Sequence, residues 1–390
     1  MNLTVPREDV DFRAEVRGWL EESVPGSMPV LDSSEGFAAH REWERKLYEA
    51  RLSAVSWPAE YGGRGASLWQ WLIFEEEYYR VQAPVRVSQN GLFLLAPTLF
   101  EFGTPEQRER FLRRMARADD VWAQAWSEPE AGSDLASLRS TATRVDGGWR
   151  LNGQKVWSTR APYADWCFGL FRSDREAPRH RGLTYFLVPL TAKGVTVRPI
   201  YQLDGNPSFG EIFFDNVFVP DTDVIGAVGE GWKVAMATAS SERGLSLRSP
   251  GRFLAAADRL VTLASELEAS DTAHLPPSLR EDVAQAWMDA EAYRLNTARS
   301  VSRMLDGQNL GPEMSLNKLF WSDMDVRIGA TALRLLGEHG ELTAAAPDAT
   351  QTGHWSDEWI FSLPSPIWGG ANEVQRNIVA ERVLGLPKGR

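Results

Sequence analysis

The sequence predicts a fold of three parts in the order α, β, α, with a small antiparallel β-barrel or sandwich between two helical domains. Apolar residues recur with helical spacing over about the first 120 residues. From residue 121 to about residue 225, short runs rich in β-forming residues alternate with turn residues. Helical spacing returns after residue 229. These changes place the three domains at residues 1–120, 121–228 and 229–390.

The N-terminal domain opens with an amphipathic helix that Pro25 ends. Four of its residues fall on one helical face, at positions i, i+4, i+7 and i+8: Phe12, Val16, Trp19 and Leu20. A later helix of this domain has a recognisable start. Thr104 is a suitable N-cap, Pro105 follows at the first helical position, and Gln107 stands three residues after the cap.

The other two domains also carry local signals. The turn Asp146-Gly147-Gly148 lies between two alternating runs and predicts a β-hairpin. In the last domain, helices are expected near Trp232, over residues 279–305 and 312–336, and from about Ala371.

The composition excludes several function classes. The net charge is −11, which argues against a nucleic acid partner because phosphate backbones bind clustered cations, whereas a small anionic ligand needs only a local basic patch. The five histidines are scattered, so we expect no metal site, and the single cysteine, Cys167, allows no internal disulfide. No apolar run reaches about 18 residues, and the first residues are not typical of a signal peptide. We therefore expect a cytoplasmic protein without a membrane span.

Two segments of the middle domain are suited to holding a ligand. The segment SEPEAGSDL has small residues and hydroxyl groups whose backbone N–H groups could bind a polar group, although a plain turn capped by Asp134 is the alternative. In KVWST, Trp157 and Thr159 stand two residues apart on a strand and so face the same side. The alternative there is a core tryptophan beside a strand threonine.

Several long segments resemble the acyl-CoA dehydrogenase family: QAWSEPEAGSDLASL, KVWSTRAPYADW, FDNVFVPDTDVIG and GGANEVQRNIVAERVLGLP. The resemblance runs from about Trp57 to the C-terminus. It implies an α-helical N-terminal domain, a middle β-domain and a C-terminal four-helix bundle, with FAD between the last two. It also implies FAD-dependent α,β-dehydrogenation of an acyl-CoA in fatty acid, sterol or other lipid metabolism. The electrons would pass to an electron-transfer flavoprotein or a similar acceptor.

The same resemblance implies the residues that hold the cofactor. The loop after the first strand would cradle the pyrimidine edge of the flavin, and Ser133 could also face the substrate. Trp157 would lie near the dimethylbenzene edge and Thr159 near N5, with Ser158 between them; Arg160 departs from the small or amide residue that is usual next. The expected FAD-binding residues are Gln124, Trp126, Ser127, Gly132, Ser133, Trp157, Ser158, Thr159, Arg334, Asn372 and Glu373.

The catalytic base departs from the commonest family pattern. The aromatic-Glu-Gly-Thr run of many members is Trp368-Gly369-Gly370-Ala371 here, so the carboxylate is absent, while Gly369 and Gly370 could still offer backbone donors to the thioester. Isovaleryl-type members carry the base directly before an arginine on the first C-terminal helix. Glu242 precedes Arg243 at that place. The resemblance thus implies Glu242 as base and Arg243 as a substrate-binding residue; the alternative is that Glu242 is a solvated surface acid.

Two FAD motifs of the family are also missing. No Arg-x-x-Phe-Gly run occurs between residues 267 and 292, although Arg280, Arg294 or Arg303 could replace it, and Arg334 replaces a glutamine before paired glycines. Two interpretations stay open: a divergent but self-sufficient site in a homodimer or homotetramer, or a mixed tetramer in which a related subunit completes the site. Two other functions also stay open. They are a flavin-dependent monooxygenase or N-hydroxylase, and a non-catalytic subunit.

Overall fold

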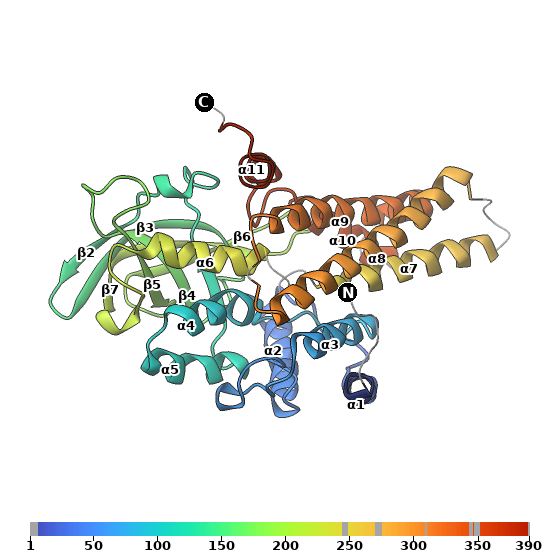
Figure 1. Ribbon diagram of the computed structural model, residues 1–390, viewed down its shortest axis with the longest axis horizontal. Coiled ribbons are helices and arrows are strands. Elements are labelled where there is room, and N and C mark those ends of the chain that lie inside the picture. The colour runs from blue at the N-terminus through green and yellow to red at the C-terminus, as the bar shows by residue number, and fades with distance from the viewer. Residues whose placement is uncertain are drawn as a thin grey trace. The chain divides into compact units, whose positions relative to one another are not determined.

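The computed structural model describes residues 7–243, 249–269, 275–308, 310–342, 346 and 352–388, without the side chains of residues 240–243, 352 and 353. The order α, β, α is confirmed (Figure 1). The N-terminal helices are α1 (Arg7–Ser23), α2 (Ser34–Glu49), α3 (Leu68–Arg80), α4 (Ala96–Phe102) and α5 (Pro105–Ala116). The strands are β1 (Trp122–Ala125), β2 (Thr141–Val145), β3 (Gly148–Thr159), β4 (Trp166–Arg172), β5 (Leu183–Pro189), β6 (Val195–Ile200), β7 (Phe209–Pro220) and β8 (Val224–Ile225). The C-terminal helices are α6 (Gly231–Arg243), α7 (Pro250–Ala269), α8 (Pro277–Leu305), α9 (Met314–Leu336), α10 (Thr352–Ser362) and α11 (Asn372–Ile378).

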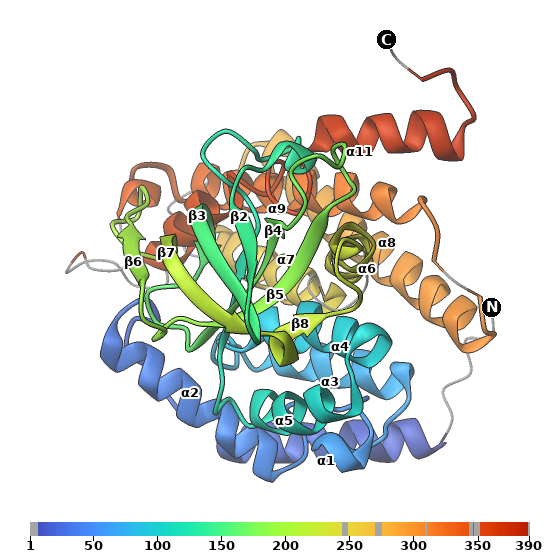
Figure 2. The same cartoon turned by 90° about the vertical axis from the view of Figure 1, so that its left-hand side faces the viewer.

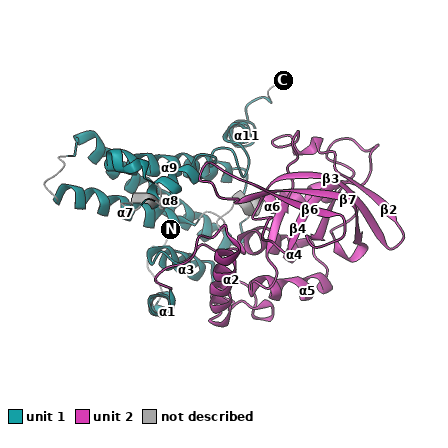
Figure 3. Cartoon of the chain, turned by 180° about the vertical axis from the view of Figure 1, so that it is seen from behind, with its two compact units in different colours: residues 1–24, 67–83, 243–390 teal, residues 25–66, 84–242 magenta. Residues whose placement is uncertain are grey.

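The chain divides into two compact units (Figure 3). The bundle unit comprises residues 1–24, 67–83 and 243–390, and the sheet unit comprises residues 25–66 and 84–242. Helices α1 and α3 therefore belong with the C-terminal bundle, because they pack on each other and α3 packs on α7. This division runs across the predicted domain boundaries at residues 120 and 228, which stay predictions.

The sheet unit is built on one eight-stranded sheet in the order β6-β7-β3-β2-β4-β5-β8, with β1 beside β4 (Figure 2). The predicted hairpin is confirmed, since β2 and β3 pair antiparallel up to Val145 and Gly148. Most neighbours are antiparallel, but β1 runs parallel to β4. Inward-facing apolar residues of these strands form the core of the unit, among them Leu151, Phe171, Phe186, Val188, Ile212 and Phe214.

The predicted start of α5 is also confirmed. The Thr104 hydroxyl oxygen accepts from the Gln107 N–H at 3.2 Å, and the Gln107 amide oxygen accepts from the Thr104 N–H at 3.0 Å. The amide nitrogen of Gln107 donates to the carbonyl oxygens of Thr222 and Val224, both at 2.8 Å. Gln107 thus caps α5 and also joins this helix to the segment that contains β8.

The bundle unit contains the predicted C-terminal bundle of α7, α8, α9 and α10. The helices predicted over residues 279–305 and 312–336 correspond to α8 and α9 within two residues at each end. Apolar side chains from one stripe of each helix form the core, including Phe253, Leu260, Val283, Tyr293, Met324 and Ile328. No helix of the described chain is long and apolar enough to span a membrane.

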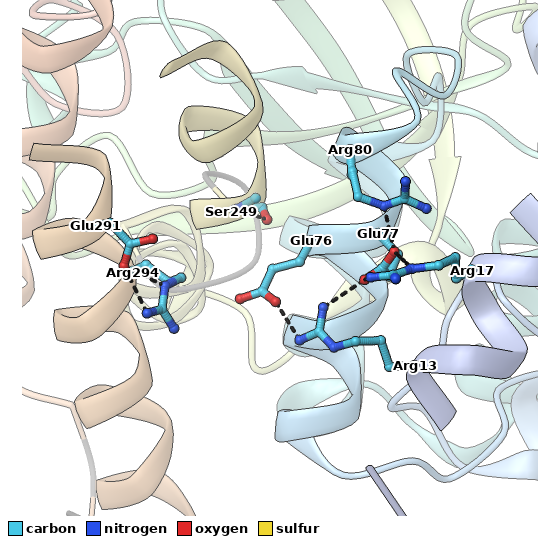
Figure 4. Close-up of polar contacts among 9 residues, drawn as sticks. Arg13, Arg17, Glu76, Glu77, Arg80, Ser249, Glu291 and Arg294 are labelled. Carbon is cyan, nitrogen blue, oxygen red and sulfur yellow. Dashed lines mark hydrogen bonds and ion pairs between the residues drawn. The ribbon is translucent and has the colours of Figure 1, made fainter. Parts of the chain in front are cut away.

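A cluster of arginines on one glutamate joins α1 to α3 in the bundle unit (Figure 4). Glu77 is almost fully buried and accepts hydrogen bonds from Arg13 at 2.7 Å, Arg17 at 2.9 Å and Arg80 at 2.8 Å. Burial alone would raise the pKa of Glu77, but the hydrogen bonds from Arg17, Arg13 and Arg80 lower it to about 2. Of the predicted apolar face of α1, Phe12, Val16 and Leu20 are buried and Trp19 is half-buried.

Candidate functional site

A buried ion pair fixes the predicted flavin loop to the sheet. Lys155 on β3 is fully buried, and its ammonium group donates to Glu128 at 2.8 Å, to the Trp126 carbonyl at 3.2 Å and to the Leu170 carbonyl at 2.8 Å. Glu128 also accepts from the backbone N–H groups of Arg139 at 2.6 Å and Ser140 at 2.9 Å. The pair therefore closes the loop of residues 126–140 at both ends.

Burial and charge act in opposite directions on the pKa values of this pair. Burial would raise the pKa of Glu128, but the Lys155 ammonium and the donors around the carboxylate hold it below its usual range. Burial lowers the pKa of Lys155, and the Glu128 charge opposes that effect. Glu128 thus structures the loop. Sequence reasoning missed Lys155, because its flanking residues Gln154 and Val156 give no sign of its burial.

The end of β3 presents Trp157 beside this loop. The Val156 N–H donates to the Ser127 carbonyl at 2.9 Å, so the loop and the strand end lie side by side. A register shift between Lys155 and Ser158 gives Trp157 a φ of +60°, and its side chain is 58% exposed. A large aromatic ring held out of the core at a bulge is an unusual arrangement. Such a ring provides a wall for a flat ligand.

The other predicted flavin residues of the sheet unit lie on β1, in the loop after it and at the end of β3. Thr159 is half-buried, as are Gln124 and Ser127, whereas Trp126 is buried and Gly132 and Ser133 are exposed. The Ser158 hydroxyl is fully buried and has no hydrogen-bond partner in the part of the chain that the structure describes. A polar atom left without a partner next to an exposed aromatic ring fits a polar, planar cofactor such as FAD. The roles of these residues toward FAD stay predictions.

Arg160, the residue that departs from the family pattern, bonds to backbone carbonyl groups of two other segments. Its backbone has a φ of +57°, and its N–H donates to the Ser208 carbonyl at 2.7 Å. Its guanidinium donates to the Arg86 carbonyl at 2.8 Å. Arg160 therefore ties the strand end to the segment before α4.

A cationic pocket of about 590 Å³ lies where the loop meets the turn between β4 and β5. Its charged lining residues are all arginines: Arg139, Arg172, Arg175 and Arg179. Arg172 donates to the backbone carbonyls of Ala136 and Arg179 and so shapes the wall. Arg179 pairs with Asp134 at 2.5 Å on the surface. Sequence reasoning missed this pocket, although the run RSDREAPRHR signals it.

In the bundle unit, a buried network holds the turn that replaces the family's carboxylate. Lys318 on α9 is almost fully buried, and its ammonium donates to the Ser365 carbonyl and, at 3.4 Å, to the Asn372 side-chain oxygen. The Asn372 amide nitrogen donates to Ser322 at 3.0 Å. The Ser365 hydroxyl donates to Asp325 at 3.1 Å. The side-chain oxygen and nitrogen of Asn372, a predicted cofactor residue, thus bond to α9 and anchor the turn.

Gly369 and Gly370 lie between these two anchors. Both are in the left-handed region, with φ of +64° and +91°. Within the described residues, neither N–H group donates a hydrogen bond. Two adjacent N–H groups without partners can bind an anionic or carbonyl oxygen. The position predicted to polarise a thioester therefore has suitable chemistry, while Glu373 lies exposed beside it.

The structure does not bring Arg334 to this turn. Arg334 lies twelve residues beyond Ser322 on the same helix, a separation of about 18 Å along the axis. Its guanidinium pairs with Asp282 of α8 at 2.5 Å. The three arginines that could replace the missing FAD motif are also paired with acids: Arg280 with Glu268 at 2.5 Å, Arg294 with Glu291 at 2.8 Å and Arg303 with Glu313 at 2.8 Å.

The predicted base and its neighbour lie at the end of α6. Glu242 is the last residue of the sheet unit and Arg243 the first of the bundle unit. Both side chains lie outside the described residues. Their roles stay predictions.

Comparisons with known proteins agree with this architecture. Models of the acyl-CoA dehydrogenase N-terminal, middle and C-terminal domains match residues 6–119, 123–217 and 229–384. The chain is 40% identical to the acyl-CoA dehydrogenase IpdE1 of Mycobacterium tuberculosis, over 98% of this chain and 99% of that protein. Two solved structures superpose over the full length of both chains with a TM-score of 0.86. They are the Tcur3481-Tcur3483 steroid ACAD, 27% identical, and the ChsE4-ChsE5 complex from Mycobacterium tuberculosis, 28% identical. The chain belongs to the acyl-CoA dehydrogenase family of oxidoreductases.

Proposed function

We propose that this protein catalyses FAD-dependent α,β-dehydrogenation of an acyl-CoA thioester to the 2-enoyl-CoA. The observation that carries the proposal is the exposed face of Trp157 beside a loop that a buried ion pair fixes. A fixed loop, a planar wall and an unpartnered buried hydroxyl group are what a flavin ring requires of its protein. The family implies FAD, and the donor set of this chain fits that cofactor.

The residues of this chain then have distinct roles. Glu242 removes the α-proton of the substrate, and Arg243 binds a polar part of it. The N–H groups of Gly369 and Gly370 donate to the thioester carbonyl and stabilise the negative charge that develops there. When bound, FAD supplies the hydride acceptor for the hydrogen on Cβ. One proton and one hydride leave the substrate as the Cα–Cβ double bond forms.

The cationic pocket supports a CoA thioester as substrate. CoA carries a diphosphate and a phosphate group, and the chain as a whole is acidic, with a net charge of −11. An anion of that kind needs a local concentration of guanidinium groups. The pocket is lined by four arginines, of which Arg139 and Arg179 are paired on the surface with Glu130 and Asp134, and Arg172 and Arg175 complete the charged lining. We expect the phosphate groups of CoA to bind there.

The assembly that best fits the bundle unit is a mixed tetramer with a paralogous subunit. The diphosphate of FAD requires cations or helix N-termini, yet Arg280, Arg294 and Arg303 are each paired with a glutamate. A related subunit would complete the site. Both structural relatives named above are two-component complexes by their titles, and one is called a steroid ACAD. We therefore propose a bulky, sterol-related acyl group and an electron-transfer flavoprotein or similar acceptor.

Anaerobic bleaching of the bound flavin by acyl-CoAs, without NAD(P)H, tests the reaction. Glu242→Gln should retain FAD but reduce it roughly 10² to 10⁴ times more slowly, which is the usual contribution of a general base. Glu230→Gln, which changes an exposed acid just before α6, is the matched control and should reduce at the wild-type rate. A Glu242→Gln enzyme that is reduced as fast as wild type has its base elsewhere. Reduction by NAD(P)H alone would instead indicate a monooxygenase.

Flavin content tests the assembly. Expressed alone, the chain should purify with less than one FAD per subunit, and co-expression with a paralogous subunit should restore it. A homogeneous homo-oligomer with one FAD per chain would contradict the mixed tetramer. A complex whose flavin is held and reduced entirely by the other subunit would mark this chain as non-catalytic.

A further inference from the structure

The turn that carries Gly369 and Gly370 uses its backbone acceptors and leaves its donors free. The carbonyl oxygens that accept hydrogen bonds from the bundle unit are those of Pro364, Ser365, Pro366, Gly370 and Ala371. In the part of the chain that the structure describes, the N–H groups of Gly369, Gly370 and Ala371 donate none. Gly370 is exposed and its two neighbours are half-buried, so the turn lies at the surface of its unit. Such a turn is suited to an acceptor oxygen as long as its peptide groups keep their orientation.

The glycine pair does not hold that orientation by itself. Gly369 and Gly370 have φ of +64° and +91°, and a glycine rotates about its backbone bonds more freely than any other residue. The anchors at Ser365 and Asn372 hold the two ends of the turn, outside the glycine pair. The middle of the turn therefore needs an anchor of its own.

Gln375 of α11 contacts the middle of the turn. It is 1% exposed, and its amide nitrogen donates to the Gly370 carbonyl at 3.3 Å. A Cβ atom at Gly370 would lie 2.4 Å from this nitrogen, so the amide group lies directly against the glycine. The N–H and C=O of a trans peptide group point in opposite directions. A Gly370 carbonyl held toward Gln375 therefore directs the Ala371 N–H away from the Gln375 side chain and restricts rotation at Gly370.

The second polar atom of this amide group indicates that Gln375 does not serve stability. Gln375 Oε1 is buried and accepts no hydrogen bond within the described residues. A buried acceptor without a partner destabilises the folded state, and a hydrogen bond of 3.3 Å is longer than usual and so compensates little. Methionine would fill a similar volume without leaving a polar atom unpaired. A residue that lowers stability and lies against a functional turn is expected to serve that turn.

We propose that Gln375 is a positioning residue for the dehydrogenation, because it holds the Gly370 peptide group so that the free N–H groups of the turn point at the thioester carbonyl. This inference rests on the proposed dehydrogenase function. In this role the amide group acts through the backbone rather than by touching the substrate. The N–H groups stabilise the negative charge that develops on the carbonyl oxygen as the α-proton leaves. Loss of Gln375 should therefore change kcat more than KM.

The test compares Gln375→Met with wild type as holoenzymes, co-expressed with the paralogous subunit if flavin binding requires it. The probe is the 2-enoyl-CoA product of an acyl-CoA that bleaches the flavin, labelled with carbon-13 at the thioester carbonyl. In infrared difference spectra, the carbonyl stretch of the bound probe moves to lower wavenumber as its oxygen accepts stronger hydrogen bonds. In Gln375→Met the stretch should lie at higher wavenumber than in wild type, and kcat should fall roughly 10- to 100-fold with little change in KM. The unfolding temperature should not fall.

Two further variants separate positioning from stability. Leu260 is fully buried in the core of the same unit, so Leu260→Ala should lower the unfolding temperature but leave the carbonyl stretch unchanged. Gln375→Glu is the conservative variant. Its carboxyl group can donate to the Gly370 carbonyl only when it is protonated, so lowering the pH should move the stretch of this variant back toward the wild-type value.

The outcomes distinguish the inference from the function on which it rests. If acyl-CoAs bleach the flavin but Gln375→Met leaves the carbonyl stretch and kcat unchanged, Gln375 is a structural residue. The inference then fails while the dehydrogenase function stands. The same conclusion follows if Leu260→Ala shifts the stretch as far as Gln375→Met does, because the stretch would then follow stability alone. If no acyl-CoA bleaches the flavin, the proposed function fails, and the inference fails with it.

Discussion

Replacing Lys155 by methionine should destabilise the protein and release the flavin. The substitution keeps most of the side-chain volume but removes three hydrogen bonds of the ammonium group, to Glu128, Trp126 and Leu170. The Glu128 carboxylate then stays buried with only two backbone N–H partners and no counter-ion. Removing one partner of a buried ion pair costs about 3 to 5 kcal/mol, so we expect a loss of this size in the free energy of unfolding.

Thermal unfolding followed by circular dichroism and flavin absorbance measures both effects. Two further variants make the experiment decisive. Arg144→Met breaks the exposed pair with Asp221 in the same sheet unit and should shift the unfolding midpoint far less, because solvent screens such pairs. The double variant of Lys155→Met and Glu128→Gln replaces the buried carboxylate by a neutral amide, so no uncompensated charge stays in the core. It should recover part of the stability that Lys155→Met alone loses.

Flavin content links this pair to the site. Lys155 donates to the Trp126 carbonyl, and Val156 donates to the Ser127 carbonyl, so loss of the ammonium group releases one of two adjacent anchors. The reasoning is refuted if Lys155→Met is no less stable than Arg144→Met. It is also refuted if the Lys155 variant is destabilised but binds flavin as tightly as wild type, because the loop would then not depend on the pair.

Three further predictions concern the flavin contact, the α1–α3 junction and the cationic pocket. Thr159→Val should change the spectrum of bound FAD and slow hydride transfer; an unaltered spectrum and rate would place Thr159 away from the flavin. Since Glu77 has its pKa lowered from 4.5 to about 2, its charge stabilises the protein above pH 4.5, and this contribution is lost as the pH falls toward 2. The difference in unfolding midpoint between wild type and Glu77→Gln should therefore be full above pH 4.5 and should shrink below it; a constant difference would contradict this. Arg175→Gln should raise KM roughly 3- to 10-fold for a CoA thioester but not for the matching pantetheine thioester, and equal effects on both would show that the pocket does not bind the nucleotide.

Local patterns were sufficient to predict much of the fold. The capping residues Thr104 and Gln107 act within one helical turn, and the hairpin before Gly148 depends on adjacent residues. Helix α8 was predicted because its apolar residues repeat along a single helix. In each case the stabilising contacts lie within a few residues of one another, so the sequence pattern contains the whole signal.

The missed features depend on contacts between distant residues. Lys155 pairs with Glu128, 27 positions earlier in the chain, because the loop after β1 lies beside the end of β3, a contact that no hairpin signal predicts. The strand alternation that predicted Trp157 and Thr159 on one side gave no indication of the bulge that turns Trp157 outward. The buried ion pair of Glu44 and Arg86 is similar, since these residues come from segments 42 positions apart. Such pairings require the tertiary structure.

The backbone of the turn at Gly369 and Gly370 explains why no glutamate stands there. Gly369 and Gly370 have φ of +64° and +91°, and a side chain in the left-handed region costs about 1 kcal/mol or more. Ser365 and Asn372 hold the two ends of the turn through buried side chains of α9, so the turn cannot relax cheaply to accept a glutamate. Its backbone can instead present two adjacent N–H groups. A turn of this shape favours carbonyl binding over proton abstraction, which agrees with the proposal that Glu242, and not a residue of this turn, is the base.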